Sequence, residues 1–252
     1  MKQRKFREAE GKFLVEGVRF VEEALKSDWE VEALICSHSF RASDRNLNFF
    51  RDVCIHETPL WLAADNIIKA VTSTQTPQGI VALVRIKETT IDHILAPNND
   101  SNRNPLVLVV DGVQDPGNLG TMIRNADAAG VDGVVLLKGT VDLFNPKALR
   151  ATMGSLFHIP VVDATIEDFG EKAKNNGVRV FVADPKGQIA VWEADLTLPV
   201  ALVLANEAHG VSDAVKSIAD KFVTIPMPGK AESLNVATST AIILYEAVKQ
   251  RS

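Results

Sequence analysis

Three stretches of the C-terminal half gather polar side chains that are suited to act on a ligand. The first, "DGVQDPGNLGTMIRNADAAG", follows an apolar run and enters a helical pattern. Its Arg124 lies one helical turn after Gly120, so the guanidinium can reach past bare backbone toward a phosphate or a substrate oxygen. Asn118 adds an amide near the start of the same helix. The alternative is a surface ion pair between Arg124 and Asp127, with Asn118 as a helix cap.

The second stretch, "LVLANEAHGVS", runs from an apolar segment directly into Asn206, Glu207 and His209. Polar side chains and a glycine beyond the carboxyl end of a strand suit a ligand loop, in which Glu207 accepts hydrogen bonds and Ser212 caps the next helix. His209 invites the role of general base. A lone histidine beside Gly210 in a loop is more often solvated than catalytic, so we assign it no role.

The third stretch, "IPMPGKAESLNVATSTAI", opens an apolar helix with Ser and Asn. Its apolar residues follow i, i+3, i+4 and i+7 spacing, which predicts a helix packed on a sheet. Ser233 or Asn235 can cap the first turn, which explains one of these two polar residues and not both. The prolines and glycine before them predict an irregular loop whose backbone groups can bind a nucleobase.

Familiar cofactor signatures are missing from the sequence. No G-x-G-x-x-G occurs, and no G-K-S/T follows a glycine-rich loop, which argues against a dinucleotide fingerprint and against a phosphate loop. Cys36 and Cys54 carry no metal-type spacing, so we expect two reduced thiols and no metal site.

Apolar runs and helical patterns alternate after residue 105, which predicts an α/β fold with a parallel sheet covered on both faces. The expected strands are Leu106–Val110, Gly133–Leu137, Arg179–Ala183, Val200–Leu204 and Lys221–Ile225. The expected helices are Asn118–Ala129, Pro146–Ser155, Ile166–Asn175, Ser212–Ala219 and Asn235–Lys249. In such a sheet, ligands bind beyond the carboxyl ends of the strands.

A smaller α/β region precedes this sheet. Its pattern predicts strands over 12–17, 31–37 and 79–88 and helices over 17–27 and 60–71. The run "APNNDSNRNP" has almost nothing to bury and predicts a linker. We therefore expect a first domain over 1–95, a linker over 96–105 and a second domain over 106–252.

The composition is typical of a soluble globular protein of the cytoplasm. Of 252 residues, 46% are hydrophobic and 23% charged, with no apolar run long enough for a membrane span and no apolar core of a secretory signal at the start. The net charge of -5 is not the balance of a protein wrapped in nucleic acid. A positive cluster at the start, Lys2, Arg4, Lys5 and Arg7, is either a solvated terminus or a contact with a polyanion.

The three polar stretches, in this order, resemble the three motifs of the SpoU (TrmH-type) branch of the SPOUT RNA methyltransferases. "DPGNLGTMIRNADAAG" is similar to motif 1, "LVLANEAHGVS" to motif 2 and "IPMPGKAESLNVATSTAI" to motif 3. "ALRATMGSLFHIPV" resembles the segment between motifs 1 and 2. "RKFREAEGKFLVEGVRFVEEAL" and "TPQGIVAL" resemble the RNA-binding accessory domain of the family, a small ribosomal-protein-like α/β/α fold.

This resemblance implies a C-terminal domain tied in a deep trefoil knot, an exception to the rule that chains avoid threading. It also implies a homodimer packed through the catalytic domains. The implied cofactor is S-adenosyl-L-methionine (AdoMet), cradled by the knotted loops. The implied cofactor-binding residues are Leu204, Ala205, Asn206, Gly210, Ile225, Met227 and Leu234.

The implied reaction is methyl transfer to a ribose 2′-hydroxyl of RNA, with ribosomal RNA of the large subunit as the expected substrate. The residues that match the polar motif positions are Asn118, Arg124, Glu207, Ser233 and Asn235. The hydroxyl loses its proton as it attacks, either to Arg124 or to an adjacent RNA phosphate, and the second route avoids deprotonating a guanidinium. The two asparagines and the serine would position the ribose and the arginine, and the glutamate would organise the site.

Three alternatives are a transfer RNA substrate, a non-catalytic RNA-binding relative and a nucleotide-dependent metabolic enzyme. The intact polar positions argue against the second alternative. The missing glycine fingerprint argues against the third.

Overall fold

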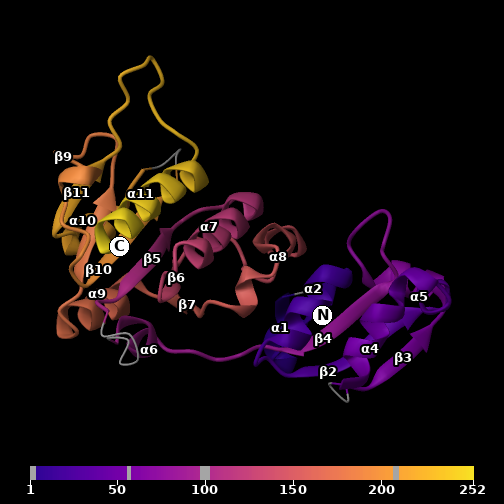
Figure 1. Ribbon diagram of the computed structural model, residues 1–252. Helices are drawn as coiled ribbons and strands as arrows, with labels where there is room; N and C mark the ends of the chain where they lie inside the picture. The colour runs from indigo at the N-terminus through magenta and orange to yellow at the C-terminus, as the bar shows by residue number, and fades with distance from the viewer. Residues whose placement is uncertain (1–3, 56–57, 97–102, 207–209) are drawn as a thin grey trace. The chain divides into compact units, whose positions relative to one another are not determined.

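The computed structural model describes residues 4–55, 58–96, 103–206 and 210–252. The chain divides into two compact units, Met1–Glu88 and Thr89–Ser252 (Figure 1). No helix in the described part of the chain is both long and apolar enough to cross a bilayer.

The first unit is built on a four-stranded mixed sheet in the order β1-β4-β2-β3. β4 runs antiparallel to β1 and β2, and β3 runs parallel to β2. The amphipathic α2 buries one face against this sheet, as its helical spacing predicts. The elements are α1 (Arg4–Glu10), β1 (Lys12–Glu16), α2 (Val18–Lys26), β2 (Val31–Ser37), α3 (His38–Arg41), α4 (Leu47–Ile55), β3 (Leu60–Ala63), α5 (Asp65–Val71) and β4 (Ile80–Arg85).

The helix predicted over 60–71 is wrong in its first third. Leu60–Ala63 is strand β3, paired with β2, and the helix begins only at Asp65. A short apolar run has the same look in a strand and in a buried helix, so its periodicity does not separate the two. Pairing with the edge of β2 decides the matter.

The basic cluster near the start of the chain is partly engaged within the first unit. Arg7, on α1, is only 5% exposed. Arg4 Nε donates to Glu8 Oε1 at 2.6 Å, one turn along the same helix. Two of the charges in the cluster are therefore engaged inside this unit, which leaves less of the cluster for a polyanion than the sequence suggested.

The second unit is a seven-stranded sheet in the order β7-β6-β5-β10-β8-β11-β9, and every neighbouring pair is parallel. The five strands expected from the sequence are present as β5 (Leu106–Asp111), β6 (Gly133–Leu137), β8 (Arg179–Ala183), β10 (Val200–Ala205) and β11 (Lys221–Thr224). The edges of the sheet are β7 (Val161–Ala164) and β9 (Ile189–Ala190), which the sequence did not predict. Both strands are short and only partly buried. Their sequences therefore lack the continuous apolar run by which the central strands were predicted.

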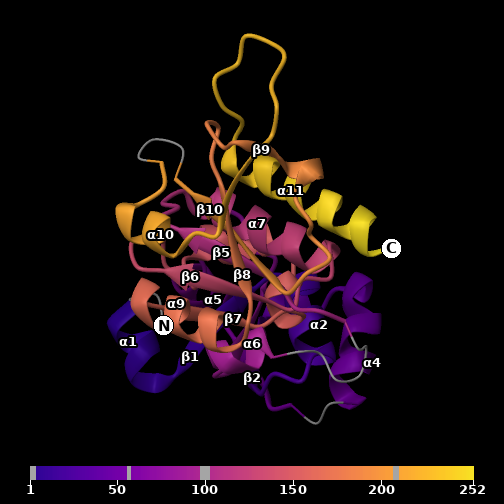
Figure 2. The ribbon, with the colours of Figure 1, turned by 90° about the vertical axis from the view of Figure 1, so that its left-hand side faces the viewer.

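Helices cover both faces of this sheet (Figure 2). One layer consists of α6 (Ile91–Leu95), α9 (Ile166–Asn175) and α10 (Asp213–Ile218), which share an apolar cluster with the central strands. The other holds α7 (Pro116–Ala128), α8 (Pro146–Thr152) and α11 (Val236–Arg251), with α7 packed against both α8 and α11. The predicted α/β class with a parallel sheet is confirmed.

The boundary predicted at residue 95 needs a correction, because α6 belongs to the second unit. Ile91, Ile94 and Leu95 are all buried in the cluster that contains Phe169 of α9. These three apolar side chains fix α6 to the sheet of the second unit, although the sequence interpretation placed them in the first domain, just before the predicted linker. Of the predicted linker, residues 97–102 lie outside the described residues.

Two strands join the sheet between strands that precede them in the chain. β10 lies between β5 and β8, and β11 lies between β8 and β9. The carboxyl ends of β8, β10 and β11 therefore sit side by side, although long stretches of sequence separate them. The order reverses at β10, which is where an open parallel sheet forms its ligand crevice.

Candidate active site

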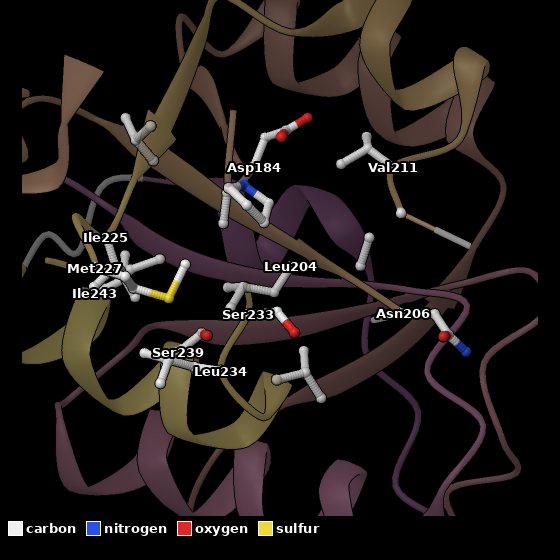
Figure 3. Close-up of a pocket in the computed structure, with 16 residues that line it drawn as sticks. Asp184, Leu204, Asn206, Val211, Ile225, Met227, Ser233, Leu234, Ser239 and Ile243 are labelled. Carbon is white, nitrogen blue, oxygen red and sulfur yellow. The ribbon is translucent and has the colours of Figure 1, made fainter. Parts of the chain in front are cut away.

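A pocket opens at the carboxyl ends of β8, β10 and β11, closed on one side by the start of α11 (Figure 3). It is lined by all of the residues that the resemblance implied for the cofactor: Leu204, Ala205, Asn206, Gly210, Ile225, Met227 and Leu234. Ser233 also lines it. Three segments of the chain thus meet around one cavity because β10 and β11 are neighbours of β8 in the sheet.

The walls of the pocket are mainly apolar, with a few polar groups at separate points. Leu204 comes from β10, and Ile243 comes from the second turn of α11. Ser233 and Ser239 supply hydroxyls, and Asp184 supplies a carboxylate. A largely apolar cavity with a small number of polar groups is typical of a small-molecule site.

The sequence interpretation missed the part of the pocket that follows β8. Ala183, Asp184 and Pro185 line the cavity, and so does Ser239 on α11. The available signal was the rule already used for β5 and β10, that a polar residue at the carboxyl end of a central strand faces the ligand crevice. Asp184 directly follows the apolar run of β8 and satisfies that rule.

The first turn of α7 meets the first turn of α11 beside this pocket. Asn235 caps α11, because its Oδ1 accepts from Ala237 N at 3.0 Å and from Thr238 N at 3.3 Å. The other end of the same amide, Nδ2, donates to Asn118 Oδ1 at 3.1 Å. The structure thus brings together two of the predicted catalytic residues that are 117 positions apart. Of the two residues proposed as caps of α11, Asn235 caps it, whereas Ser233 lines the pocket.

The cap of α7 is Asp115 and not Asn118. Asp115 Oδ1 accepts from Asn118 N at 2.9 Å, and its Oδ2 accepts from Lys147 Nζ of α8 at 2.9 Å. These bonds, with that of Lys147 the largest, hold the pKa of the Asp115 carboxyl below its ordinary value. The Asn118 amide is thereby released from capping and bonds across to α11.

Arg124 is an exposed residue on α7 whose side chain forms no ion pair or hydrogen bond among the described residues. The surface pair with Asp127 that the sequence offered as an alternative is wrong, because Asp127 Oδ2 lies 3.0 Å from His158 Nδ1. No described residue therefore occupies the guanidinium of Arg124, which leaves it available for a ligand.

Gly120 allows α7 and α8 to approach closely. A Cβ at this position would lie 2.5 Å from Ala151 Cβ and would also collide with the carbonyl oxygen of Ala148. Only a glycine fits at this contact, which lies one turn before Arg124. The glycine that the sequence suggested as an open approach for a ligand is instead covered by α8, and this corrects its interpretation.

The candidate catalytic residue Glu207 lies outside the described residues, as does His209, to which the sequence interpretation assigned no role. Gly210 resumes the described chain with φ 63°, a left-handed conformation that favours glycine, and its N–H donates to Asn206 O at 2.9 Å. In the described parts of the chain, His, Cys, Asp and Glu side chains form no group of three or more that could hold a metal ion. Cys36 is a buried free thiol.

An open parallel sheet with a pocket at its switch point defines an α/β protein with an enzyme-like ligand site. The family model "SpoU rRNA Methylase family" matches residues 105–245, more than half of the chain. A second model, "MRM3-like substrate binding domain", matches residues 1–82. The chain belongs to the SpoU rRNA methylase family.

Individual relatives cover nearly the whole chain. The 23S rRNA (guanosine(2553)-2′-O)-methyltransferase RlmP of Bacillus subtilis is 38% identical over 92% of this chain and 87% of its own length. The 23S rRNA (uridine(2479)-2′-O)-methyltransferase of Streptomyces viridochromogenes is 32% identical over 96% of this chain and 84% of its own. The crystal structure of the SpoU methyltransferase AviRb from the same organism, in complex with AdoMet, matches with a TM-score of 0.87 and 32% identity, over 99% of this chain and 94% of that one.

Proposed function

We propose that this protein transfers the methyl group of AdoMet to a ribose 2′-hydroxyl of ribosomal RNA of the large subunit. The observation that carries the proposal is the meeting of two features at one edge of the sheet. One is the apolar pocket lined by Leu204, Ile225 and Leu234. The other is the polar pair Asn118–Asn235 at its border, with Arg124 further along α7.

The residues of the pocket fit AdoMet in their chemistry. Leu204, Ile225 and Met227 offer apolar surface for an adenine ring and for methylene groups. Asp184 and Ser239 offer acceptors for ribose hydroxyls or for an ammonium group. Backbone groups at the carboxyl ends of the strands remain for the edge of the base.

AdoMet, when bound, supplies a methyl group on a positively charged sulfonium, which makes the transfer to an oxygen favourable without a metal ion. The chain has to hold the ribose hydroxyl in line with that methyl group and to manage the hydroxyl proton. Ser233, at the pocket, and the linked amides of Asn118 and Asn235 are placed to hold the ribose. Glu207 completes the proposed set of catalytic residues.

Arg124 acts on the proton indirectly in this proposal. A guanidinium stays protonated, so it is a poor base, but it binds phosphate through paired N–H donors. Arg124 would hold an RNA phosphate next to the hydroxyl, and that phosphate would accept the proton while the methyl group passes from sulfur to the ribose oxygen and leaves a neutral thioether. Its exposure and its lack of a partner among the described residues support this role.

The first unit is proposed to bind the RNA, so that the RNA-binding domain predicted over residues 1–95 becomes residues 1–88. The match of residues 1–82 to a substrate-binding domain supports this assignment. Because Arg7 is buried, the phosphate contacts have to come from other residues as well. A ribosomal RNA substrate would also place the enzyme in the cytoplasm.

We also propose a trefoil knot and a homodimer in the second unit. The insertion of β10 and β11 between earlier strands, followed by the return of α11 onto α7, supports the knot. Tyr245 and Ile242 of α11 leave 63% and 39% of their surface exposed, which supports a partner helix on that face.

The test is methyl transfer from labelled AdoMet to total RNA of a strain that lacks the gene, with the modified riboses mapped. We expect incorporation at one nucleotide of large-subunit RNA by the wild type and its loss in Arg124→Ala. Label in transfer RNA alone would favour the alternative that the substrate is transfer RNA. Absence of both label and AdoMet binding would favour the non-catalytic relative.

A further inference from the structure

Asn206 makes hydrogen bonds that point away from the pocket that it lines. Its Nδ2 donates to Gly112 O at 3.1 Å, and its backbone N–H donates to Asp111 O at 3.1 Å. The backbone bond continues the ladder between β10 and β5, in which Ala205 pairs with Asp111. The side-chain bond links the next residue of each segment, Asn206 and Gly112, beyond the last pair of the two strands. In Figure 3, Asn206 lies at the rim, away from the apolar side chains around Leu204.

Asp111 holds the chain a second time, on the far side of residues 207–209. Its Oδ2 accepts from Ser212 N at 3.3 Å. Ser212 in turn caps α10 through its bond with Val215 N at 3.3 Å. The end of β5 therefore contacts both Asn206 and Ser212, the two residues by which the second motif leaves β10 and enters α10.

Thr140 holds the turn at Gly112, the residue that follows β5. Its Oγ1 accepts from Gly112 N at 3.2 Å and donates to Val110 O at 3.1 Å. Gly112 has φ 66°, so its backbone takes a conformation that favours glycine, and both of its polar groups are bonded to side chains. This turn leads directly into Asp115, the cap of α7.

We propose that Asn206 and Asp111 are positioning residues that tie the cofactor pocket to the helix that carries Asn118 and Arg124. The inference rests on the proposed function, because it concerns how AdoMet and RNA act together. A ligand that orders the end of β10 also orders Gly112 through the Asn206 amide, and hence the start of α7. AdoMet in the pocket and RNA on α7 therefore strengthen the binding of each other.

Such coupling is reciprocal and can be measured at equilibrium. If the cofactor tightens RNA binding by a given factor, RNA tightens cofactor binding by the same factor. S-adenosylhomocysteine, which lacks the transferable methyl group, serves as the cofactor probe, with protein-free large-subunit RNA as the second ligand. For the wild type we expect a factor of about 5 or more, the lower end of typical coupling.

The variant Asn206→Ala removes the amide and keeps the backbone bond. We expect the coupling factor to fall to about 2 or less, and kcat at saturating AdoMet to fall with it. The matched control is Asn176→Ala, because the Nδ2 of Asn176 also donates to a backbone carbonyl, that of Lys172 at 2.9 Å, on the far helix α9. This control should retain the coupling of the wild type.

Two results would overturn the inference. One is a wild type without coupling. The other is an Asn206→Ala variant that keeps the coupling and binds AdoMet more weakly, which would make Asn206 a cofactor contact only. If Asn206→Ala does not fold, Thr140→Val replaces it, since Thr140 holds Gly112 without lining the pocket, and Thr140→Ser should restore the coupling. Failure of the proposed function is distinct, since the wild type would then neither bind AdoMet nor methylate RNA.

Discussion

The two walls of the proposed site are built in opposite ways. The pocket wall, at the ends of β8, β10 and β11, consists of apolar side chains with few polar groups. The helix wall, formed by α7 against α8, presents Arg124, Asp115 and Lys147 to solvent. Asn235 joins the two walls, because it caps α11 at the pocket and bonds to Asn118 on α7.

The difference teaches which forces each ligand would use. An apolar wall binds through burial and shape, so its contribution depends on how well a neutral ring fills it. A wall of exposed charges binds through phosphate contacts, so its contribution depends on salt. Substitutions on the two walls should therefore change different quantities. Substitutions of Arg124 and Leu234 test this separation, and further substitutions test the packing and the bonds that hold the helix wall.

The largest effect is expected on the helix wall. Arg124→Ala should lower kcat for methyl transfer by about 10²-fold to 10⁴-fold, while the affinity for AdoMet stays unchanged. Steady-state kinetics and calorimetry measure the two quantities. Arg179→Ala is the matched control, because this exposed arginine lies at the opposite end of the sheet in a surface pair with Asp220. A parallel loss of AdoMet affinity in Arg124→Ala would contradict the separation.

The second prediction concerns the packing behind the helix wall. Gly120→Ala should lower the free energy of unfolding by about 1–3 kcal/mol, because the new methyl group has no space between α7 and α8. Chemical denaturation measures this change. Gly229→Ala is the control, since a Cβ there meets nothing within 4 Å. Equal stabilities of the two variants would show that α8 yields to the added methyl group.

The third prediction concerns the pocket wall. Leu234→Ala should weaken AdoMet binding about tenfold, because part of a leucine side chain no longer covers the ligand. The kcat at saturating AdoMet should stay within about threefold of the wild type, as expected for binding that is uniform along the reaction. Leu198→Ala removes an exposed leucine that precedes β10 and does not line the pocket, so it should leave the affinity unchanged. An unaltered affinity in Leu234→Ala would place the ligand elsewhere.

The smallest effects separate the two bonds of Asp115. Asp115→Ala should cost about 1 kcal/mol of stability through the lost helix cap. Lys147→Ala should cost less than about 1 kcal/mol, because this ion pair is exposed to solvent. It should also raise the pKa of Asp115 toward its ordinary value, which carboxyl NMR titration measures. If Lys147→Ala lowered the stability more than Asp115→Ala, the ion pair would contribute more than the helix cap, which would contradict the prediction.

The sign of the associated pH dependence follows from the lowered pKa of Asp115. A carboxyl with a lowered pKa in the folded state stabilises the fold above its ordinary pKa of about 4. That contribution is lost as the pH falls through the folded value. In Lys147→Ala, the interval between the folded and the ordinary pKa of Asp115 should be smaller, so stability should change less with pH. In Asp115→Ala, this contribution to the pH dependence of stability should be absent.

The sequence by itself determined most of the elements of the second unit. Long apolar runs such as Val200–Leu204 identify central parallel strands, because both faces of such a strand are buried. The caps at Thr165 and Ser212 and the helices after them follow from local hydrogen bonding and spacing. The resemblance to family motifs then indicated which loops line the pocket.

The tertiary structure decided what depends on contacts between distant residues. Strand pairing turned Leu60–Ala63 into β3, and burial in the sheet assigned α6 to the second unit. The order of strands placed Asp184 at the pocket, and the approach of α11 to α7 joined Asn118 to Asn235. Similarly, the turn before η2 (Ser155–Phe157) ends α8 at Thr152 and brings His158 to Asp127, which leaves Arg124 without that partner. Local periodicity records which face of an element is buried, whereas it does not record which neighbour buries it.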